Sequence, residues 1–324
     1  MNTLLEVSGL KKYFPVPGGL FGRPVAEVRA VDGVSFAIRK GRVLGLVGES
    51  GCGKSTVGRV ILSLIPKTDG QIVFDGTDLS ACSKKDLAAV RRRMQMVFQD
   101  PFSSLDPRMN VFDIIAEGPR NFKMFATPDA LSDHVFDLMR KCGLFPEQAD
   151  RYAHQFSGGQ RQRICIARAL ATDPDFIVLD EAVSALDVSI QAQIINLLKD
   201  LQEDGDLTYL FISHDLNIVR FISDDVAVMY LGEIVESGTA EEIFGDPKHP
   251  YTEALLSAVP AFTKEEKAAK KRIILNGELP SPYDMPEGCR FAERCPYAEE
   301  RCRKEKPELA ETGGSHLCRC HLRS

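Results

Sequence analysis

Residues 48–56 read Gly48-Glu49-Ser50-Gly51-Cys52-Gly53-Lys54-Ser55-Thr56 and fit the pattern G-x-x-x-x-G-K-S/T with no mismatch. The short apolar run Val43–Val47 before them predicts a buried strand, and the run Thr56–Leu64 after them predicts a helix. A strand, a glycine-rich loop and a helix in this order form the context that the pattern requires. The alternative, a glycine-rich turn with a chance lysine, leaves these two flanking segments unexplained.

The residue types in this loop suit a phosphate group. Glycines at 48, 51 and 53 let the backbone curl so that its N–H groups point inward at an anion. The positive end of the following helix adds to this attraction. Lys54 can reach the β- and γ-phosphates of a nucleotide, and the Ser55 hydroxyl can bind Mg²⁺.

Composition places the chain among ordinary globular proteins. Of its 324 residues, 44% are hydrophobic and 27% are charged. No apolar run reaches the length of a membrane span, and the N-terminal residues show no secretory signal, so we expect a cytosolic chain that does not cross the bilayer. The net charge of −6 argues against a nucleic-acid-binding protein.

The first third of the chain alternates strands and helices. Residues 4–10 and 25–38 alternate apolar and polar positions and predict antiparallel strands, joined by a loop rich in Gly and Pro that runs through Pro24. From spacing alone, Tyr13 between them is expected to pack on the sheet. Further strands are expected at 72–74 and 96–98, with a charged helix at 84–93 between them. Residues 100–155 predict a helical insertion, with helical patterns at 111–117 and 128–142.

Two later motifs add chemistry. Ser157-Gly158-Gly159-Gln160 precedes a predicted helix at 161–171 and exposes backbone N–H groups to an anion, although alone it is a weak motif. Asp175–Leu179 predicts a core parallel strand that ends in Asp180 and Glu181, at the edge where open α/β sheets bind ligands. Asp180 suits Mg²⁺ coordination through water, and Glu181 can polarise an attacking water. The alternative is a solvated pair of acids.

The next segment predicts a strand at 208–213 that ends at His214, which could contact a γ-phosphate or merely pack. Residues 226–230 and 233–238 then predict a hairpin around Leu231-Gly232. The run 263–272 predicts a solvated helix or linker.

Five of the nine cysteines lie in the last 36 residues: Cys289, Cys295, Cys302, Cys318 and Cys320. In the cytosol such a cluster suggests metal binding rather than disulfides. Four thiolates suit zinc or an iron–sulfur cluster. The spacing lacks the paired knuckles of zinc ribbons, and Cys295-Pro296 is typical of cluster-binding sequences, so iron–sulfur is favoured over zinc and over free thiols.

Taken in order, these motifs resemble those of ATP-binding-cassette (ABC) transporter ATPases over about residues 4–245. The resemblance rests on the phosphate loop, Gln99, the 157–160 motif, the two acids, Ser184-Ala185-Leu186-Asp187 and His214. Two departures are visible: Phe156 stands where leucine is usual, and Ala182 where proline is usual. Because alanine lacks the φ restriction of proline, the loop after the acids is expected to be looser, without loss of activity.

The resemblance implies roles for individual residues. Tyr13 would stack on adenine, and Gln99 would sense Mg²⁺ and the γ-phosphate. Glu181 would be the general base, with His214 positioning the γ-phosphate. Ser157 and Gly159 would bind the nucleotide held by an opposite subunit. The implied catalytic set is Glu181, His214, Gln99 and Lys54. The implied nucleotide-contacting set is Tyr13, Gly48, Glu49, Ser50, Gly51, Cys52, Gly53, Lys54, Ser55, Thr56, Gln99, Ser157, Gly158, Gly159, Gln160, Asp180 and Asp187, with Ser55, Gln99 and Asp180 on Mg²⁺.

Finer motifs are similar to the second ATPase subunit of oligopeptide and dipeptide importers. They are Val97–Arg108, His249–Pro260 and Gly277–Pro282 followed by the cysteines. The resemblance points to a [4Fe–4S] cluster on Cys289, Cys295, Cys302 and Cys320, with Cys320 favoured over Cys318.

The expected fold is therefore an α/β P-loop NTPase of the ABC type, with an antiparallel β-subdomain, a helical subdomain at about 100–165 and a small Cys-rich C-terminal domain. Residues 1–250 would form the nucleotide-binding domain and 251–324 an oligopeptide-transporter-type extension. The implied partners are a second, non-identical ATPase subunit, two transmembrane permeases and, indirectly, an extracytoplasmic solute-binding protein. Through the permeases, the chain would be peripheral at the cytoplasmic face of the inner membrane.

Two alternatives to peptide import stay open. Related importers of nickel or another small solute share these ATPase motifs. A soluble ABC ATPase acting on ribosomes or DNA is a different class, but such proteins usually carry tandem cassettes or long coiled coils, which this sequence lacks.

Overall fold

The computed structural model describes residues 2–18, 23–259, 273–275, 277, 283 and 285–323. The expected linker at 263–272 and the segment 278–282 lie outside the described residues. The chain divides into two compact units, each described here by itself. The first comprises Met1–Leu5, Ile38–Val43 and Val73–Ile212; the second comprises Glu6–Ala37, Leu44–Ile72 and Ser213–Ser324.

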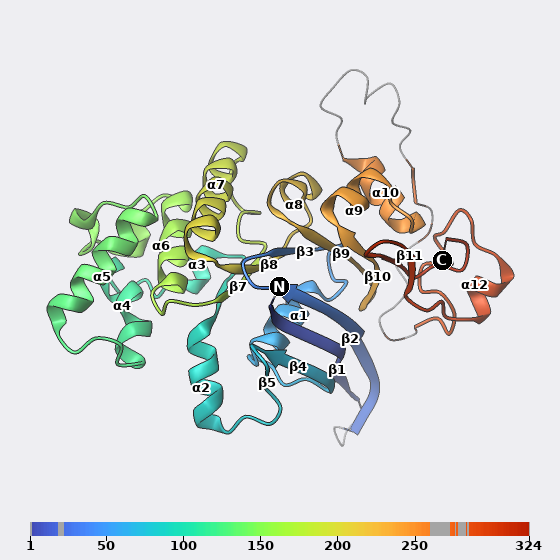
Figure 1. Ribbon diagram of the computed structural model, residues 1–324, viewed down its shortest axis with the longest axis horizontal. Helices are drawn as coiled ribbons and strands as arrows, with labels where there is room; N and C mark the ends of the chain where they lie inside the picture. Colours follow the sequence, from blue (N-terminus) through green and yellow to red (C-terminus); the bar gives the residue numbers. More distant parts are fainter. Residues whose placement is uncertain are drawn as a thin grey trace. The chain divides into compact units, whose positions relative to one another are not determined.

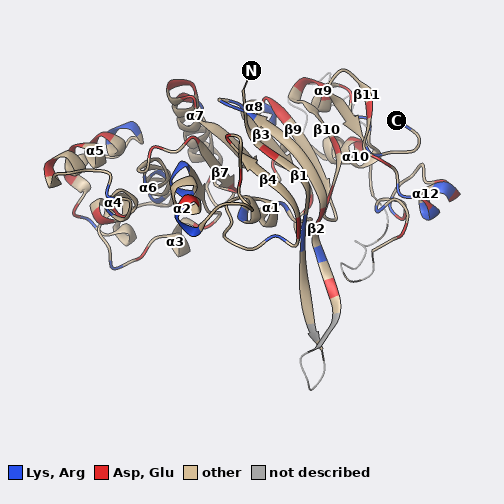
Figure 2. Ribbon diagram, turned by 60° about the horizontal axis from the view of Figure 1, so that its bottom comes forward, with Lys and Arg blue, Asp and Glu red and all other residues tan. Residues whose placement is uncertain are grey.

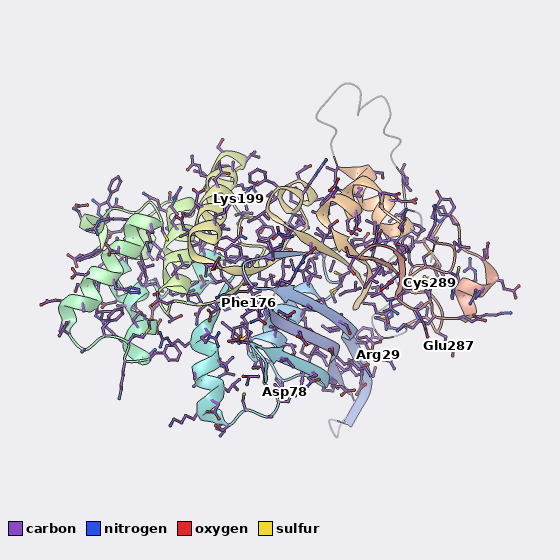
Figure 3. The ribbon with its side chains drawn as sticks, viewed as in Figure 1. Arg29, Asp78, Phe176, Lys199, Glu287 and Cys289 are labelled. Atoms are coloured by element: carbon purple, nitrogen blue, oxygen red, sulfur yellow. The ribbon has the colours of Figure 1, made fainter. Side chains whose placement is uncertain are left out.

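Three parallel strands form the centre of the first unit. They are β6 (Met94–Val97), β7 (Phe176–Asp180) and β8 (Thr208–Ile212), with Val97 opposite Leu179 and Leu179 opposite Phe211. Every residue of β7 and β8 is buried, as continuous apolar runs predict for parallel strands. The strand expected at 96–98 begins two residues earlier. Phe176 lies at the start of β7 (Figure 3) and its ring contacts that of Phe74.

Helices make up most of the rest of the first unit, as expected for residues 100–155. Their N-caps are short polar side chains, including Asn110, Thr127 and Ser157, which accept hydrogen bonds from the first turn. The green helices α4, α5 and α6 gather together (Figure 1) and contact one another. The elements are α2 (Lys84–Arg93), α3 (Pro101–Ser104), α4 (Val111–Asn121), α5 (Pro128–Lys141), the 3-10 turns Pro146–Gln148 and Ala153–Gln155, α6 (Gly158–Leu170) and α7 (Val188–Gly205).

Two long strands lie mostly in the second unit. β1 (Thr3–Gly18) lies between β2 (Arg23–Arg39) and β4 (Asp69–Phe74) in one sheet. Both β1 and β2 are longer than the alternation at 4–10 and 25–38 predicted. Residues 11–18 and 23–24, which lie outside the predicted strands, continue β1 and β2. The last two residues of β4 belong to the first unit, where they pair with β5 (Thr77–Asp78).

A second sheet in this unit joins the phosphate loop to the tail. β3 (Val43–Val47) pairs in parallel with β9 (Asp225–Tyr230), and β9 forms the expected antiparallel hairpin with β10 (Glu233–Thr239). Beyond β10 come β12 (His316–Cys318) and β11 (Ala310–Gly313), both antiparallel to their neighbours. The helices of this unit are α1 (Lys54–Ile61), α8 (Leu216–Ile222), α9 (Ala240–Gly245), α10 (Pro250–Ala258) and α12 (Glu300–Lys304).

Glu236 in the middle of β10 is completely buried and ties together three segments. Its Oε1 accepts from the backbone N–H of Lys248 at 2.5 Å and from His316 Nε2 at 2.6 Å, and its Oε2 accepts from the backbone N–H of His249 at 3.0 Å. Both oxygens therefore face donors, which satisfies the buried carboxylate.

We expect Glu236→Gln to loosen the tail. The amide NH₂ of glutamine would face a backbone or imidazole donor, and losing a hydrogen bond to a buried charged group costs about 2 kcal/mol. Thermal unfolding and limited proteolysis after α10 should both report it. Glu241→Gln on the exposed start of α9 is the matched control. Equal stability of the two variants would contradict the role given to Glu236.

Candidate nucleotide site

The loop between β3 and α1 is held closely against neighbouring main chain. Gly48 and Gly53 have φ values of +152° and +109°. A Cβ on Gly48 would lie 2.1 Å from the Met229 carbonyl oxygen, and one on Gly53 would lie 2.0 Å from that of Ala30. Neither position admits another side chain without moving backbone. The predicted strand, loop and helix are confirmed, although α1 begins at Lys54 and ends at Ile61.

Lys54 points back into the loop that precedes it. Its side chain is only 4% exposed, and Nζ donates to the carbonyl oxygens of Gly48 at 2.8 Å and Glu49 at 2.9 Å. Its charge is therefore fixed beside the loop N–H groups. Burial raises the pKa of the neighbouring Cys52 thiol despite the charge of Lys54, so the thiol stays protonated.

Tyr13 lies on β1 with its hydroxyl fixed. The hydroxyl donates to Asp32 Oδ1 at 2.5 Å, and the Arg29 guanidinium lies 5.6 Å from the ring centre. Arg29 projects from β2 (Figure 3). Burial and the bond to Asp32 raise the pKa of Tyr13 to about 12, so the phenol stays neutral. Burial would raise the pKa of Asp32, but the Tyr13 hydroxyl and Arg290 outweigh it and hold that pKa below its ordinary value. A neutral, oriented ring is suited to stacking.

In the first unit, β7 delivers the two acids as predicted. Asp180 is 1% exposed, and Glu181 follows at a φ of +47°. The Glu181 N–H donates to Ile212 O, and Ser184 donates to Glu181 O through both N–H and Oγ, so the turn is closed despite the missing proline. Gln99 Nε2 donates to Glu181 Oε2 at 2.8 Å. The structure thus brings together two residues that are 82 positions apart in the sequence.

The 157–160 motif begins α6, three residues before the predicted helix start. The Ser157 hydroxyl accepts from Gln160 N–H, and Gln160 Oε1 accepts from Ser157 N–H, which forms a capping box. A Cβ on Gly159 would lie 2.5 Å from the side chain of Ile190. Asp187 likewise caps α7 by accepting from the N–H of Ile190. The start of α6 therefore carries Ser157 and Gly159, which the resemblance assigns to the nucleotide of an opposite subunit, and the start of α7 carries Asp187.

His214 belongs to the second unit and is exposed, beside Asp215, which caps α8. Ser55 and Thr56 lie in the first turn of α1, also in the second unit, whereas Gln99, Asp180, Glu181 and the 157–160 motif lie in the first. The predicted site residues therefore form one group in each unit.

Four tail cysteines line one small cavity, together with Phe291 and His249: they are Cys289, Cys295, Cys302 and Cys320. These are the four predicted cluster ligands, and Cys318 is not among the lining residues. Nevertheless, within the part of the chain that the structure describes, no group of three or more His, Cys, Asp or Glu side chains is arranged as a metal site. Burial and neighbouring thiols raise the pKa of Cys289 to about 11, and burial also raises those of Cys295 and Cys320.

Three residues that contact the predicted nucleotide-binding residues Tyr13 and Glu49, directly or through one another, were not identified from the sequence. They are Asp32, Arg290 and Arg294. Arg290 bonds to Asp32, and Arg294 bonds to Glu49 of the phosphate loop. These contacts join residues more than 240 positions apart, so no local pattern marks them. The only signal was the position of both arginines between Cys289 and Cys295.

Comparisons with known proteins agree with this geometry. A family described as ABC transporter matches residues 31–184, and one described as oligopeptide/dipeptide transporter, C-terminal region, matches 235–302. The oligopeptide transport ATP-binding protein AppF of Bacillus subtilis is 54% identical over 100% of this chain and 98% of its own length. The dipeptide transport ATP-binding protein DppF of Haemophilus influenzae is 48% identical over 98% of this chain and 97% of its own length.

Solved structures show the same fold. CbiO1 of Clostridium perfringens, part of an ABC transporter complex, has a TM-score of 0.65 and 27% identity, covering 76% of this chain and 92% of its own. The ATP-binding cassette MJ0796, solved as a dimer with ADP and Pi, has a TM-score of 0.64 and 26% identity, covering 73% and 99%. The fold and loop define a P-loop ATPase. The chain belongs to the ABC transporter family, among its ATP-binding proteins. Among the described helices, none is long and apolar enough to span a membrane.

Lys54→Ala tests the loop directly. Because the lysine charge would act on the phosphates in both the ground state and the transition state, its loss should weaken ATP binding as well as hydrolysis. Equilibrium titration with a fluorescent ATP analogue should show an affinity at least about tenfold lower. Lys84→Ala, at the exposed start of α2, should bind like the unaltered chain. Unchanged affinity in Lys54→Ala would remove Lys54 from the site.

Proposed function

We propose that this chain hydrolyses ATP to drive the import of di- or oligopeptides through a membrane transporter. The observation that carries the proposal is similarity over the full length to ATP-binding proteins of peptide transporters, including the C-terminal region at 235–302. The geometry of the phosphate loop supports the proposal that the chain binds ATP, because Gly48 and Gly53 leave no room for a Cβ and Lys54 lies beside the loop.

Each site residue has a proposed role. The loop residues 48–56 hold the phosphates through their N–H groups and Lys54. Oxygen ligands from Ser55, Gln99 and Asp180 suit Mg²⁺, which would neutralise charge on the β- and γ-phosphates. Glu181 acts as general base toward water; its bond from Gln99 keeps its carboxylate oriented. His214 positions the γ-phosphate, and Tyr13 stacks on adenine.

Ser157 and Gly159, at the start of α6, are proposed to bind the γ-phosphate of the nucleotide held by a second ATPase subunit, because the positive N-terminal end of a helix suits an anion. Asp187, which caps α7, is proposed to lie at the interface with that subunit. We propose a non-identical partner ATPase, two permeases and an indirect solute-binding protein, with the chain peripheral at the cytoplasmic face and with no nucleic-acid partner. Residues 1–250 are proposed as the nucleotide-binding domain and 251–324 as the extension.

Co-purification tests the proposed partners: the chain should co-purify with permeases and not with ribosomes. A measured ligand of the solute-binding protein would distinguish peptide import from nickel import.

Glu181→Gln should abolish turnover while leaving ATP binding intact. The amide has the same shape but cannot accept the proton of water, and general bases contribute on the order of 100-fold or more to rate. ATP hydrolysis by the assembled transporter measures the first effect, and nucleotide titration of the chain measures the second. Glu147→Gln, exposed in a 3-10 turn, is the control. Hydrolysis near the unaltered rate would show that Glu181 is not the base.

We also propose that Cys289, Cys295, Cys302 and Cys320 hold a [4Fe–4S] cluster with a structural role. The supporting observation is that these four thiols, and not Cys318, line one cavity. Four thiolates are the ligands of such clusters and also of zinc. Metal binding would oppose the rise in thiol pKa that burial causes here, because it favours the deprotonated form. The arrangement of the side chains would have to tighten around the metal.

Replacement of one cysteine at a time tests the ligand set. Anaerobically purified chain should be brown, with about four irons per chain. Cys302→Ser should lose the colour and become sensitive to protease in the tail, whereas the buried Cys318→Ser should keep the iron. Colourless protein with one zinc per chain would show that the four cysteines bind zinc and not an iron–sulfur cluster. Metal-free protein with an ordered tail would refute both the cluster and the zinc site.

A further inference from the structure

The turn at Glu49 is held from outside the phosphate loop. Its backbone N–H donates to the Tyr251 hydroxyl at 2.8 Å. Its carboxylate accepts from both terminal nitrogens of Arg294, at 2.9 and 3.1 Å. Its carbonyl accepts from Lys54. The same carbonyl also accepts from the Cys52 N–H. Thus every polar group of Glu49 has a partner, and two of the four partner residues, Tyr251 and Arg294, lie in the last 75 residues of the sequence.

The pairing of Arg294 with Glu49 is bidentate and largely shielded from solvent. The side chains of Arg294 and Glu49 are only 11% and 24% exposed. Arg294 also donates to the Tyr230 hydroxyl. A planar guanidinium bonded at two points fixes orientation as well as position, which a lysine cannot do.

A second tail arginine reaches the Tyr13 side of the same unit. Arg290 donates to Asp32 Oδ2, while Asp32 Oδ1 accepts from the Tyr13 hydroxyl. Arg290 also donates to the Leu231 carbonyl and pairs with buried Glu233 at 3.1 Å. Arg290 itself is 7% exposed. The carboxylate of Asp32 is thus shared between the tyrosine and the arginine.

Both arginines lie on one rigid segment. Phe291, between them, is buried and contacts the rings of Tyr230, Tyr251 and His249 at 5.4 to 5.7 Å. Cys289, which precedes the segment, is labelled in Figure 3. Residues 290–294 therefore present two fixed cations, one to the phosphate loop and one to the carboxylate that orients Tyr13.

We propose that Arg294 and Arg290 are positioning residues for nucleotide binding: Arg294 fixes the phosphate loop through Glu49, and Arg290 fixes Tyr13 through Asp32. This inference rests on the proposed function, because it assumes that the loop binds ATP phosphates and that Tyr13 stacks on adenine. The tail thereby contributes to nucleotide affinity from residues that do not touch the nucleotide.

The two arginines make separable contributions, which two ligands can distinguish. MgATP uses both the adenine and the phosphate contacts, whereas magnesium tripolyphosphate uses only the phosphate contacts. Arg294→Met should lower the affinity for both ligands about tenfold, because the phosphate loop loses its orientation. Arg290→Met should lower the affinity for MgATP about fivefold and leave the affinity for tripolyphosphate within about twofold, because Tyr13 loses its orientation while the contacts that hold Glu49 stay in place. Competition against a fluorescent ATP analogue, on the full chain, measures all four affinities.

Three further variants complete the test. Arg301→Met removes an exposed arginine of α12, where both basic and acidic residues lie (Figure 2); it pairs with Glu305 and its loss should change neither affinity. Arg294→Lys keeps the charge without the bidentate bond, so its affinities should lie between those of the unaltered chain and those of Arg294→Met. The double variant Glu49→Gln with Arg294→Met should bind no more weakly than the weaker single variant, since both changes remove the same interaction.

The outcomes separate the inference from the function on which it rests. If the unaltered chain binds neither ligand, the proposed function fails. If it binds MgATP but Arg294→Met changes only the melting temperature, or if Arg290→Met weakens both ligands equally, the positioning roles are wrong. Should either methionine variant fail to fold, Arg294→Lys and Asp32→Asn decide in the same assay: unchanged affinities in both overturn the inference.

Discussion

The second unit depends on one close packing contact, the main chain of the phosphate loop against two carbonyl groups. At Gly48 and Gly53 there is no room for a Cβ, because the carbonyl oxygens of Met229 and Ala30 occupy that space. The same strands that supply these carbonyls, β9 and β2, therefore determine where the loop N–H groups point. Lys54, the first residue of α1, bonds back to the Gly48 carbonyl at one end of this packed backbone.

The tail belongs to this same structural arrangement. β12 pairs with β10, and buried Glu236 joins β10 to the start of α10 and to His316. β10 follows β9 in a tight hairpin, and β9 lies beside β3, which leads into the phosphate loop. A short path of backbone pairing therefore connects the cysteine-lined cavity to the loop, and Arg290 and Arg294 add side-chain contacts along it.

Features carried by local patterns were predicted from the sequence. The strand and helix around the loop, the hairpin at 226–238 and the strand ending in Asp180 and Glu181 follow from apolar runs and turn residues only a few positions apart. Features decided by distant contacts were not. The length of β1 and the raised pKa of Cys52 depend on neighbours in space, as do the partners of Arg290 and Arg294. The four cavity cysteines were predicted in part. Their clustering in the last 36 residues was evident from the sequence, but their arrangement around one cavity was not.

The most direct test of this account is the structure of the full chain with Mg²⁺ and a slowly hydrolysed ATP analogue. The account predicts the β- and γ-phosphates within hydrogen-bond distance of Lys54 Nζ and of the N–H groups of residues 51–55, adenine against the ring of Tyr13, and Glu49 still bonded to Arg294 and Tyr251. Phosphates bound away from residues 48–56 would contradict the assignment of the site. Phosphates in the loop with the Glu49 pairing broken would contradict the part that the tail plays in it.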